Sequence, residues 1–107
     1  MTLYWRAAST IGEAYTVFTH VIEPAGVQIW GQLDSQPAGG HRPTSGWQVG
    51  EIIEDEYLIP LAADIRPGTY WVEVGLYLPK TMERLAVSGR GADPVVRRVL
   101  LGPVQVR

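Results

Sequence analysis

Apolar and polar residues alternate with a period of two along most of this chain, a pattern typical of half-buried β-strands. The most regular stretch is "RPGTYWVEVGLYLPKTMERLAV", residues 66–87, which predicts a hairpin with one apolar face suited to a core. The apolar face consists of Tyr70, Val72, Val74, Leu76 and Leu78. Because side chains alternate, Trp71, Glu73, Gly75 and Tyr77 are expected on the opposite face.

Further alternating runs predict strands elsewhere along the chain, namely over residues 2–7, 14–23, 27–35 and 51–61 and one bent strand or two over 95–107. Glycine and proline separate these runs, and they predict a short hairpin turn at 24–26, further turns at 62–68 and 79–82, and a loop at 91–94. Within 27–35 we expect Val27, Ile29 and Leu33 to face inward and Trp30 to lie on the polar side. Within 51–61, the residues expected to face inward are Ile53, Tyr57, Ile59 and Leu61.

About seven or eight short strands with turns between them, and no convincing helix, predict an all-β fold. The expected architecture is an antiparallel two-sheet β-sandwich, of jelly-roll or immunoglobulin-like type. The 107 residues suit one domain over 1–107, and an apolar content of 46% is that of a globular chain.

Both ends of the sequence fall inside predicted strands, whereas domains usually have slack at their termini. We therefore expect a domain cut from a longer protein, with one or more strands missing a neighbour at the N-terminal side. An unpaired strand edge is a template for pairing with another chain. This predicts a homodimer through residues 1–7 or 95–107.

Charge and cysteine content exclude several classes of function. A net charge of −2 with scattered basic residues gives no footprint for nucleic acid. The absence of cysteine removes disulfides and thiolate metal sites. No apolar run approaches the roughly 20 residues needed to cross a bilayer. We expect neither a metal nor a cofactor.

Catalytic patterns are weak. Glu54 and Glu56 share one strand face, roughly 6.5–7 Å apart, within the separation of an inverting glycosidase, but a solvated strand face is the simpler interpretation. No Ser–His–acid constellation, GxSxG elbow or phosphate loop is present. His20, between Phe18 and Ile22, is expected to be half-buried and hydrogen-bonded to a neighbouring strand or side chain. This domain is not expected to be an enzyme by itself.

The aromatic residues suggest a binding role. Flat rings beside polar side chains are what sugar binding needs, because a ring stacks on the C–H face of a pyranose while polar groups take its hydroxyls. The alternative is that the tryptophans are simply packed, since tryptophan is highly buried on average. The irregular loop 36–50 adds polar candidates. The candidate ligand-binding residues are Trp30, Asp34, His41, Arg42, Trp47, Trp71 and Tyr77.

Several motifs in order resemble one bacterial group: "LYWRA" (3–7), "YTVFTHVIEPAG" (15–26), "RPTSGWQVGEIIEDEYLIPL" (42–61), "PGTYWVEVGLY" (67–77) and "ERL" (83–85). The chain resembles the carboxy-terminal extracytoplasmic β-sandwich of multi-spanning membrane glycosyltransferase-like proteins, related to protein O-mannosyltransferases and lipid-linked aminoarabinose transferases. In that group the sandwich usually begins a strand or two before the "LYWRA" motif.

The resemblance implies a non-catalytic accessory domain attached to the membrane on its extracytoplasmic side. The membrane-embedded part of such proteins carries the glycosyl-transfer chemistry, and none of its acidic residues matches a position here. The implied partners are the parent membrane domain and a carbohydrate or glycan acceptor. The alternative is a structural domain that packs on its parent or on a second copy, with no ligand of its own.

Overall fold

The structure is a computed structural model that describes residues 1–23 and 28–107. Strands dominate these residues, and the only helices among them are two short 3₁₀ turns, η1 (Pro37–Gly40) and η2 (Thr44–Gly46). The strands are β1 (Thr2–Arg6), β2 (Thr16–Ile22), β3 (Ile29–Gln32), β4 (Ile52–Glu56), β5 (Gly68–Tyr77), β6 (Ala92–Asp93) and β7 (Arg98–Val106). No helix in the described part of the chain is long and apolar enough to cross a membrane.

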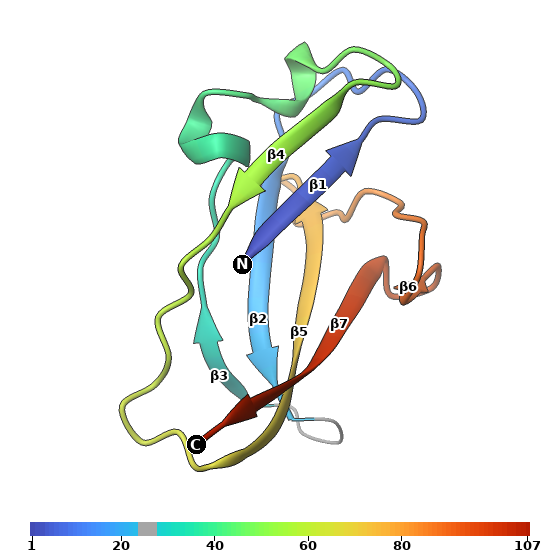
Figure 1. The fold of residues 1–107 in the computed structure, drawn as a ribbon. Coiled ribbons are helices and arrows are strands. Elements are labelled where there is room, and N and C mark those ends of the chain that lie inside the picture. The colour runs from blue at the N-terminus through green and yellow to red at the C-terminus, as the bar shows by residue number, and fades with distance from the viewer. Residues whose placement is uncertain (24–27) are drawn as a thin grey trace.

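The strands form two antiparallel sheets that pack face to face (Figure 1). The smaller sheet pairs β1 with β4, and the larger has the order β3-β2-β5-β7-β6. This arrangement confirms the predicted all-β sandwich. The two layers are unequal, so the smaller sheet covers only part of one face of the larger sheet.

The core lies between the layers and is built as the alternation predicts. Tyr70, Val72, Val74 and Leu76 of β5 are buried, while Leu78 is half-buried. Val17 and Val21 of β2 and Leu3 and Tyr57 on the smaller-sheet side pack against them. Burying each large apolar side chain stabilises the fold by about 1.5–3 kcal/mol.

A β-bulge overturns the predicted facing of residues 29 and 30. In the pairing with β2, Val21 lies opposite Gly31 but Ile22 lies opposite Ile29, so Trp30 is an extra residue in the ladder. The extra residue shifts the alternation by one. Trp30 therefore turns into the core and Ile29 is exposed, the reverse of the prediction.

The segment after β4 returns across the open edge of β3. Leu61 forms an antiparallel bridge with Gly31, and the amide of Ala62 donates to the Trp30 carbonyl at 2.7 Å. Glycine at position 31 permits this approach, since a Cβ there would lie 2.8 Å from the Pro60 carbonyl oxygen. Leu61 makes this contact with its backbone atoms. Its side chain is exposed, so the predicted inward orientation is wrong.

One loop prediction is wrong near the C-terminus. Residues 91–94, predicted as a loop, contain β6, which pairs with the start of β7. β7 is one bent strand, and its register with β5 shifts between Tyr70 and Val72, beside Gly102-Pro103. The predicted turn at 24–26 lies outside the described residues.

Candidate functional site

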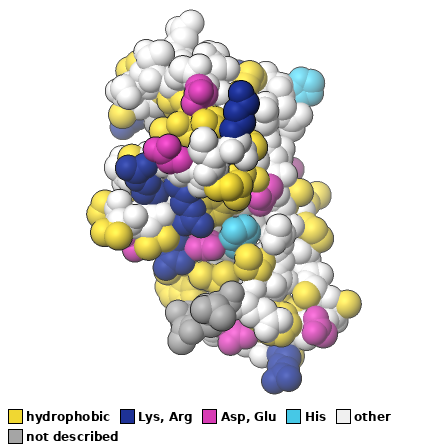
Figure 2. Space-filling model, turned by 180° about the vertical axis from the view of Figure 1, so that it is seen from behind, with side chains coloured by type: hydrophobic (Ala, Val, Ile, Leu, Met, Phe, Trp, Pro, Cys, Tyr) yellow, Lys and Arg dark blue, Asp and Glu magenta, His cyan; other side chains and the backbone are white. Residues whose placement is uncertain are grey.

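The face of the larger sheet that points away from the smaller sheet carries the polar side chains. Since Val17, Thr19 and Val21 face the core, Phe18 and His20 of β2 point to this outer face. Figure 2 shows acidic and basic side chains gathered on it beside a histidine. The outer face is therefore the place to look for binding chemistry.

Glu73 is the centre of an ion-pair network on the outer face. It lies directly opposite His20 in the β2–β5 ladder, and its Oε1 is 2.8 Å from the His20 Nδ1. Arg98 of β7 donates from Nη1 to the other carboxylate oxygen at 2.7 Å. The hydrogen bond with His20, helped by Arg98 and opposed by burial, lowers the pKa of Glu73 from the ordinary value of 4.5 to about 2. Glu73 is therefore a fixed anion that orients the imidazole.

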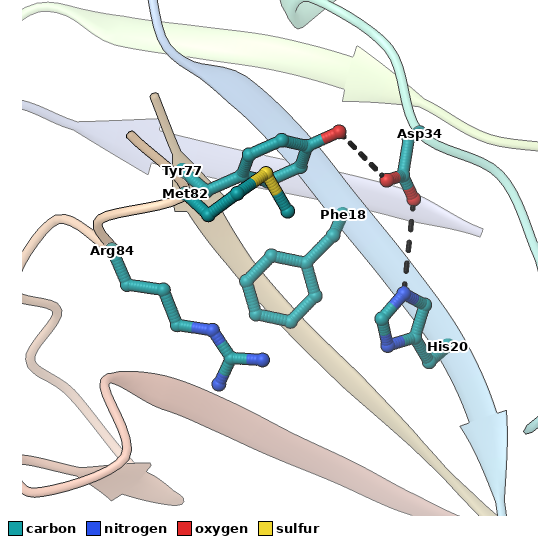
Figure 3. Close-up of a pocket in the computed structure, with 6 residues that line it drawn as sticks. All are labelled: Phe18, His20, Asp34, Tyr77, Met82 and Arg84. Atoms are coloured by element: carbon teal, nitrogen blue, oxygen red, sulfur yellow. Dashed lines mark hydrogen bonds and ion pairs between the residues drawn. The ribbon is translucent and has the colours of Figure 1, made fainter. Parts of the chain in front are cut away.

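Asp34 lies at the far side of that imidazole. Its Oδ1 is 3.8 Å from the His20 Nε2, and its Oδ2 accepts a hydrogen bond from the Tyr77 hydroxyl at 3.0 Å. Burial, together with this bond to Asp34, raises the pKa of the Tyr77 phenol. The Asp34 carboxylate is thus held between a hydroxyl and an imidazole, as Figure 3 shows.

Phe18 forms the floor beside these groups. It lies opposite Gly75 in the ladder, and a Cβ at Gly75 would come within 2.5 Å of the Phe18 ring, so glycine lets the ring lie flat on the sheet. The guanidinium of Arg84 covers the ring at 4.4 Å from its centroid, a cation–π geometry. Arg84 is itself held by donation to the Val96 carbonyl at 3.0 Å. Phe18 is only 2% exposed as a result.

Together these side chains line an open hollow of about 220 Å³ (Figure 3). Its lining is Phe18, His20, Asp34, Tyr77, Met82 and Arg84. Carboxylate, imidazole and phenol line one side, and the guanidinium lies over the Phe18 ring. The hollow can therefore offer hydrogen-bond acceptors and donors, while the Phe18 ring lies beneath the guanidinium.

Two of the predicted stacking residues are buried. Trp30 is 9% exposed, and its Nε1 donates to Glu23 Oε1 at 2.7 Å. Trp47 is 6% exposed, packs against Ala7 and Ile53, and donates to the Arg42 carbonyl. The stacking prediction is wrong for both rings, because each is packed in a core cluster with its N–H satisfied.

The remaining predicted residues are scattered. Trp71 is half-buried and lies against Gly102 on β7. His41 and Arg42 are exposed in the 36–50 loop, where Arg42 forms an ion pair with Glu51. Among the seven residues proposed from sequence, the structure brings only Asp34 and Tyr77 together in the hollow.

His20 fulfils its sequence prediction as a half-buried histidine bonded across strands. Sequence reasoning missed Phe18, Arg84 and Arg98 as members of the site. The opposite-face position of Glu73 was the available signal, since a half-buried carboxylate on a strand requires cationic partners.

Asp55, between Glu54 and Glu56 on β4, is buried at the small-sheet end. Its Oδ2 accepts from the Trp5 Nε1 at 3.0 Å, and its Oδ1 accepts from the Ala38 amide at 2.9 Å. It thereby fastens η1 to β4. Glu54 and Glu56 are exposed on the other face of that strand. In the described ranges, no group of three potential ligand side chains is placed to hold a metal ion.

Comparison of the chain with protein-family models, with curated proteins and with solved structures gave no significant match.

Proposed function

We propose that this chain is a non-catalytic binding module that takes a small polyhydroxylated ligand, such as a single sugar ring, in the hollow on the outer face. The observation that carries the proposal is the convergence of Asp34, His20 and Arg84 on one hollow. Asp34 Oδ1 and His20 Nε2 approach each other without a direct hydrogen bond, at 3.8 Å. A ligand hydroxyl between them would satisfy both groups.

The chemistry and the size of the hollow also suit a sugar. The Asp34 carboxylate is already oriented by Tyr77, and the His20 imidazole by Glu73, so neither group loses much conformational freedom on binding. Charge-assisted hydrogen bonds to hydroxyls are stronger than neutral ones. The hollow is smaller than the cavities that hold drug-sized ligands, roughly 300–1,000 Å³, which favours one ring over an oligosaccharide.

A titration of the ¹⁵N-labelled protein with common hexoses and pentoses tests this proposal. Chemical shifts should move at Phe18, His20, Tyr77 and Arg84 and nowhere on the smaller sheet. Asp34→Ala is expected to weaken binding about tenfold or more, because one charged hydrogen-bond acceptor is lost. Arg42→Gln changes an exposed loop residue that does not line the hollow, so it is the matched control and should bind normally. Titrations that stay flat for every sugar would reject the proposal.

The parent of the domain is also a proposal. In keeping with the motif resemblance, the domain belongs to a multi-spanning membrane glycosyltransferase-like protein and stands on the extracytoplasmic side, where it presents or holds a glycan acceptor. We expect the reading frame upstream of Met1 to encode several hydrophobic segments of about 20 residues each. An upstream frame encoding only polar sequence, or a stop codon close to Met1, would contradict this parentage.

A second candidate is a domain that docks on its parent protein. The observation in its favour is the outer face of the smaller sheet, where Tyr4 is 67% exposed and Ile52 is also exposed. Arg6 lies directly opposite Ile52, and Glu54 lies opposite Tyr4, so charged residues border these apolar side chains. Apolar positions with a charged border are typical of transient protein contacts.

A further inference from the structure

Arg84 lines the hollow without an acidic partner. A β-bridge places Arg84 directly opposite Tyr77, so both side chains lie on the outer face. The Arg84 guanidinium lies over the Phe18 ring and donates from Nη1 to the Val96 carbonyl. No ion pair of Arg84 is found in the part of the chain that the structure describes. A guanidinium carries five N–H donors and this hydrogen bond uses one of them, so donors remain for a ligand.

A second guanidinium is held against the same segment. Arg97 donates from Nη1 to the Arg84 carbonyl at 2.6 Å, while Arg84 donates to the carbonyl of Val96, the residue before Arg97. Within residues 1–23 and 28–107, Arg97 also has no ion pair. The carboxylate of the neighbouring Asp93 is occupied by the amides of Val95 and Val96. Two positive charges are therefore kept side by side on this part of the surface, and a bound anion would relieve their repulsion.

The acidic side of the hollow suits a hydroxyl group and not an anion. Asp34 faces the His20 Nε2 across a gap of 3.8 Å, which a hydroxyl can bridge. Glu73 has both oxygens occupied, one by His20 and one by Arg98, so it adds negative charge without taking a ligand group. Figure 3 shows Asp34 and Arg84 at opposite ends of the lining. A ligand with one anionic end is therefore oriented with that end toward Arg84.

We infer that the hollow prefers an acidic monosaccharide, a hexuronate, whose carboxylate pairs with Arg84 and whose ring hydroxyls bind Asp34 and His20. The inference rests on the proposed sugar binding and adds the class of sugar. In a hexuronate the carboxylate on C5 lies across the pyranose ring from the hydroxyls on C2 and C3, so one ring offers both kinds of group at its two ends. A carboxylate is planar and accepts two parallel hydrogen bonds from a guanidinium.

A sugar phosphate fits the hollow less well. A phosphate monoester carries a charge of about −1.5 to −2 at neutral pH, whereas a carboxylate carries a single negative charge. The Asp34 carboxylate lines the same hollow and the Glu73 carboxylate lies directly behind His20. Both repel the more highly charged group more strongly. A monoanion is therefore the better match.

Titration of the ¹⁵N-labelled protein with matched pairs of sugars tests the inference. Each pair consists of a methyl hexuronide and the corresponding methyl hexoside, in the gluco and the galacto series, and its members differ only in the group on C5. In at least one series the uronide should bind about tenfold or more tightly than the hexoside, because a charge-assisted pair replaces a neutral hydrogen bond. This preference should shrink as salt is added, since salt screens exposed charges.

The variant Arg84→Gln should bring the two sugars of the pair to about equal affinity, because the cation that selects the carboxylate is gone. Arg90→Gln is the matched control. It removes the same charge from an exposed residue that does not line the hollow, so the preference should persist. Thermal unfolding of each variant verifies that it folds, since Arg84 also covers Phe18. The comparison of uronide with hexoside on the unaltered protein decides the inference if Arg84→Gln does not fold.

The outcomes separate this inference from the proposal beneath it. Equal affinity for uronide and hexoside overturns the inference and leaves sugar binding intact, whereas no binding of either sugar rejects both. Tighter binding of a methyl hexoside 6-phosphate than of the uronide would assign the hollow to a phosphate-bearing ligand and overturn the inference. A preference for the uronide that persists in a folded Arg84→Gln variant would overturn the pairing of the carboxylate with Arg84.

Discussion

Replacement of Glu73 by alanine is expected to lower the free energy of unfolding by about 3 kcal/mol, since removing one partner of a largely buried ion pair leaves the others unpaired. The Glu73 side chain is 12% exposed and holds both His20 and Arg98. Its loss would leave the Arg98 guanidinium on a half-buried strand without an anion. Urea denaturation at neutral pH measures the effect.

The difference in stability between the native protein and the Glu73→Ala variant should depend on pH. The direction of this dependence follows from the lowered pKa of the Glu73 carboxyl group. Because the pKa of Glu73 is lowered to about 2 in the folded protein from an ordinary 4.5, the ionised group stabilises the fold fully above about pH 4.5. That contribution is lost as the pH falls through 4.5 toward 2. The stability gap between the native protein and the Glu73→Ala variant should narrow over this range. A gap that stays constant with pH would contradict the role of the network.

Glu56→Ala is the matched control for Glu73. Glu56 is an exposed strand carboxylate without a hydrogen-bond partner among the side-chain contacts of the described residues. Its removal should change the free energy of unfolding by less than about 0.5 kcal/mol. A loss as large as that of Glu73→Ala would show that both effects reflect net charge and not the local network.

Replacement of Asp55 by alanine should also lower the free energy of unfolding by about 3 kcal/mol, because each buried donor left without an acceptor costs about 1–3 kcal/mol. The two donors are the Trp5 indole and the Ala38 amide. Tryptophan fluorescence should shift as Trp5 loses its contact, and protease cleavage in the 36–50 loop should accelerate because η1 is released from β4.

Two comparisons make the Asp55 result specific. Asp55→Asn keeps one acceptor oxygen and should lose about half as much stability, roughly 1–2 kcal/mol. Glu54→Ala, next to it on the exposed face of β4, should be nearly neutral. If Asp55→Ala were as stable as Glu54→Ala, the buried carboxylate would not be what fastens the loop.

The fold class and most of the core were predictable from the sequence, because a period-two pattern fixes which side chains share a face. Tyr70, Val72, Val74 and Leu76 are buried for this reason. Alternation along one strand does not reveal an extra residue inserted in a strand pair, so the pattern assigned Trp30 and Ile29 to the wrong faces. A bulge depends on the pairing with β2, which alternation within one strand does not encode.

The candidate site was less predictable because it depends on strand order. Asp34 and Tyr77 are 43 residues apart in sequence and meet only because β3, β2 and β5 are neighbours. Arg98 reaches Glu73 because β7 pairs with the other side of β5. Neither adjacency follows from local patterning. The binding-site prediction failed for the buried tryptophans for a different reason. An aromatic ring on a strand with a polar pattern can still be buried by a bulge or by a loop that folds back over it.

The return of residues 60–62 across β3 has a consequence for further strand pairing. Pro60 has no N–H to offer, and the bridge at Leu61 consumes the backbone groups of Gly31, so that flank of the larger sheet cannot template growth. At the opposite flank β6 is only two residues long. Because β6 pairs only with Arg98 and Val99 of β7, most of β7 has no neighbouring strand on that side, so pairing with a further strand is blocked at the β3 flank alone.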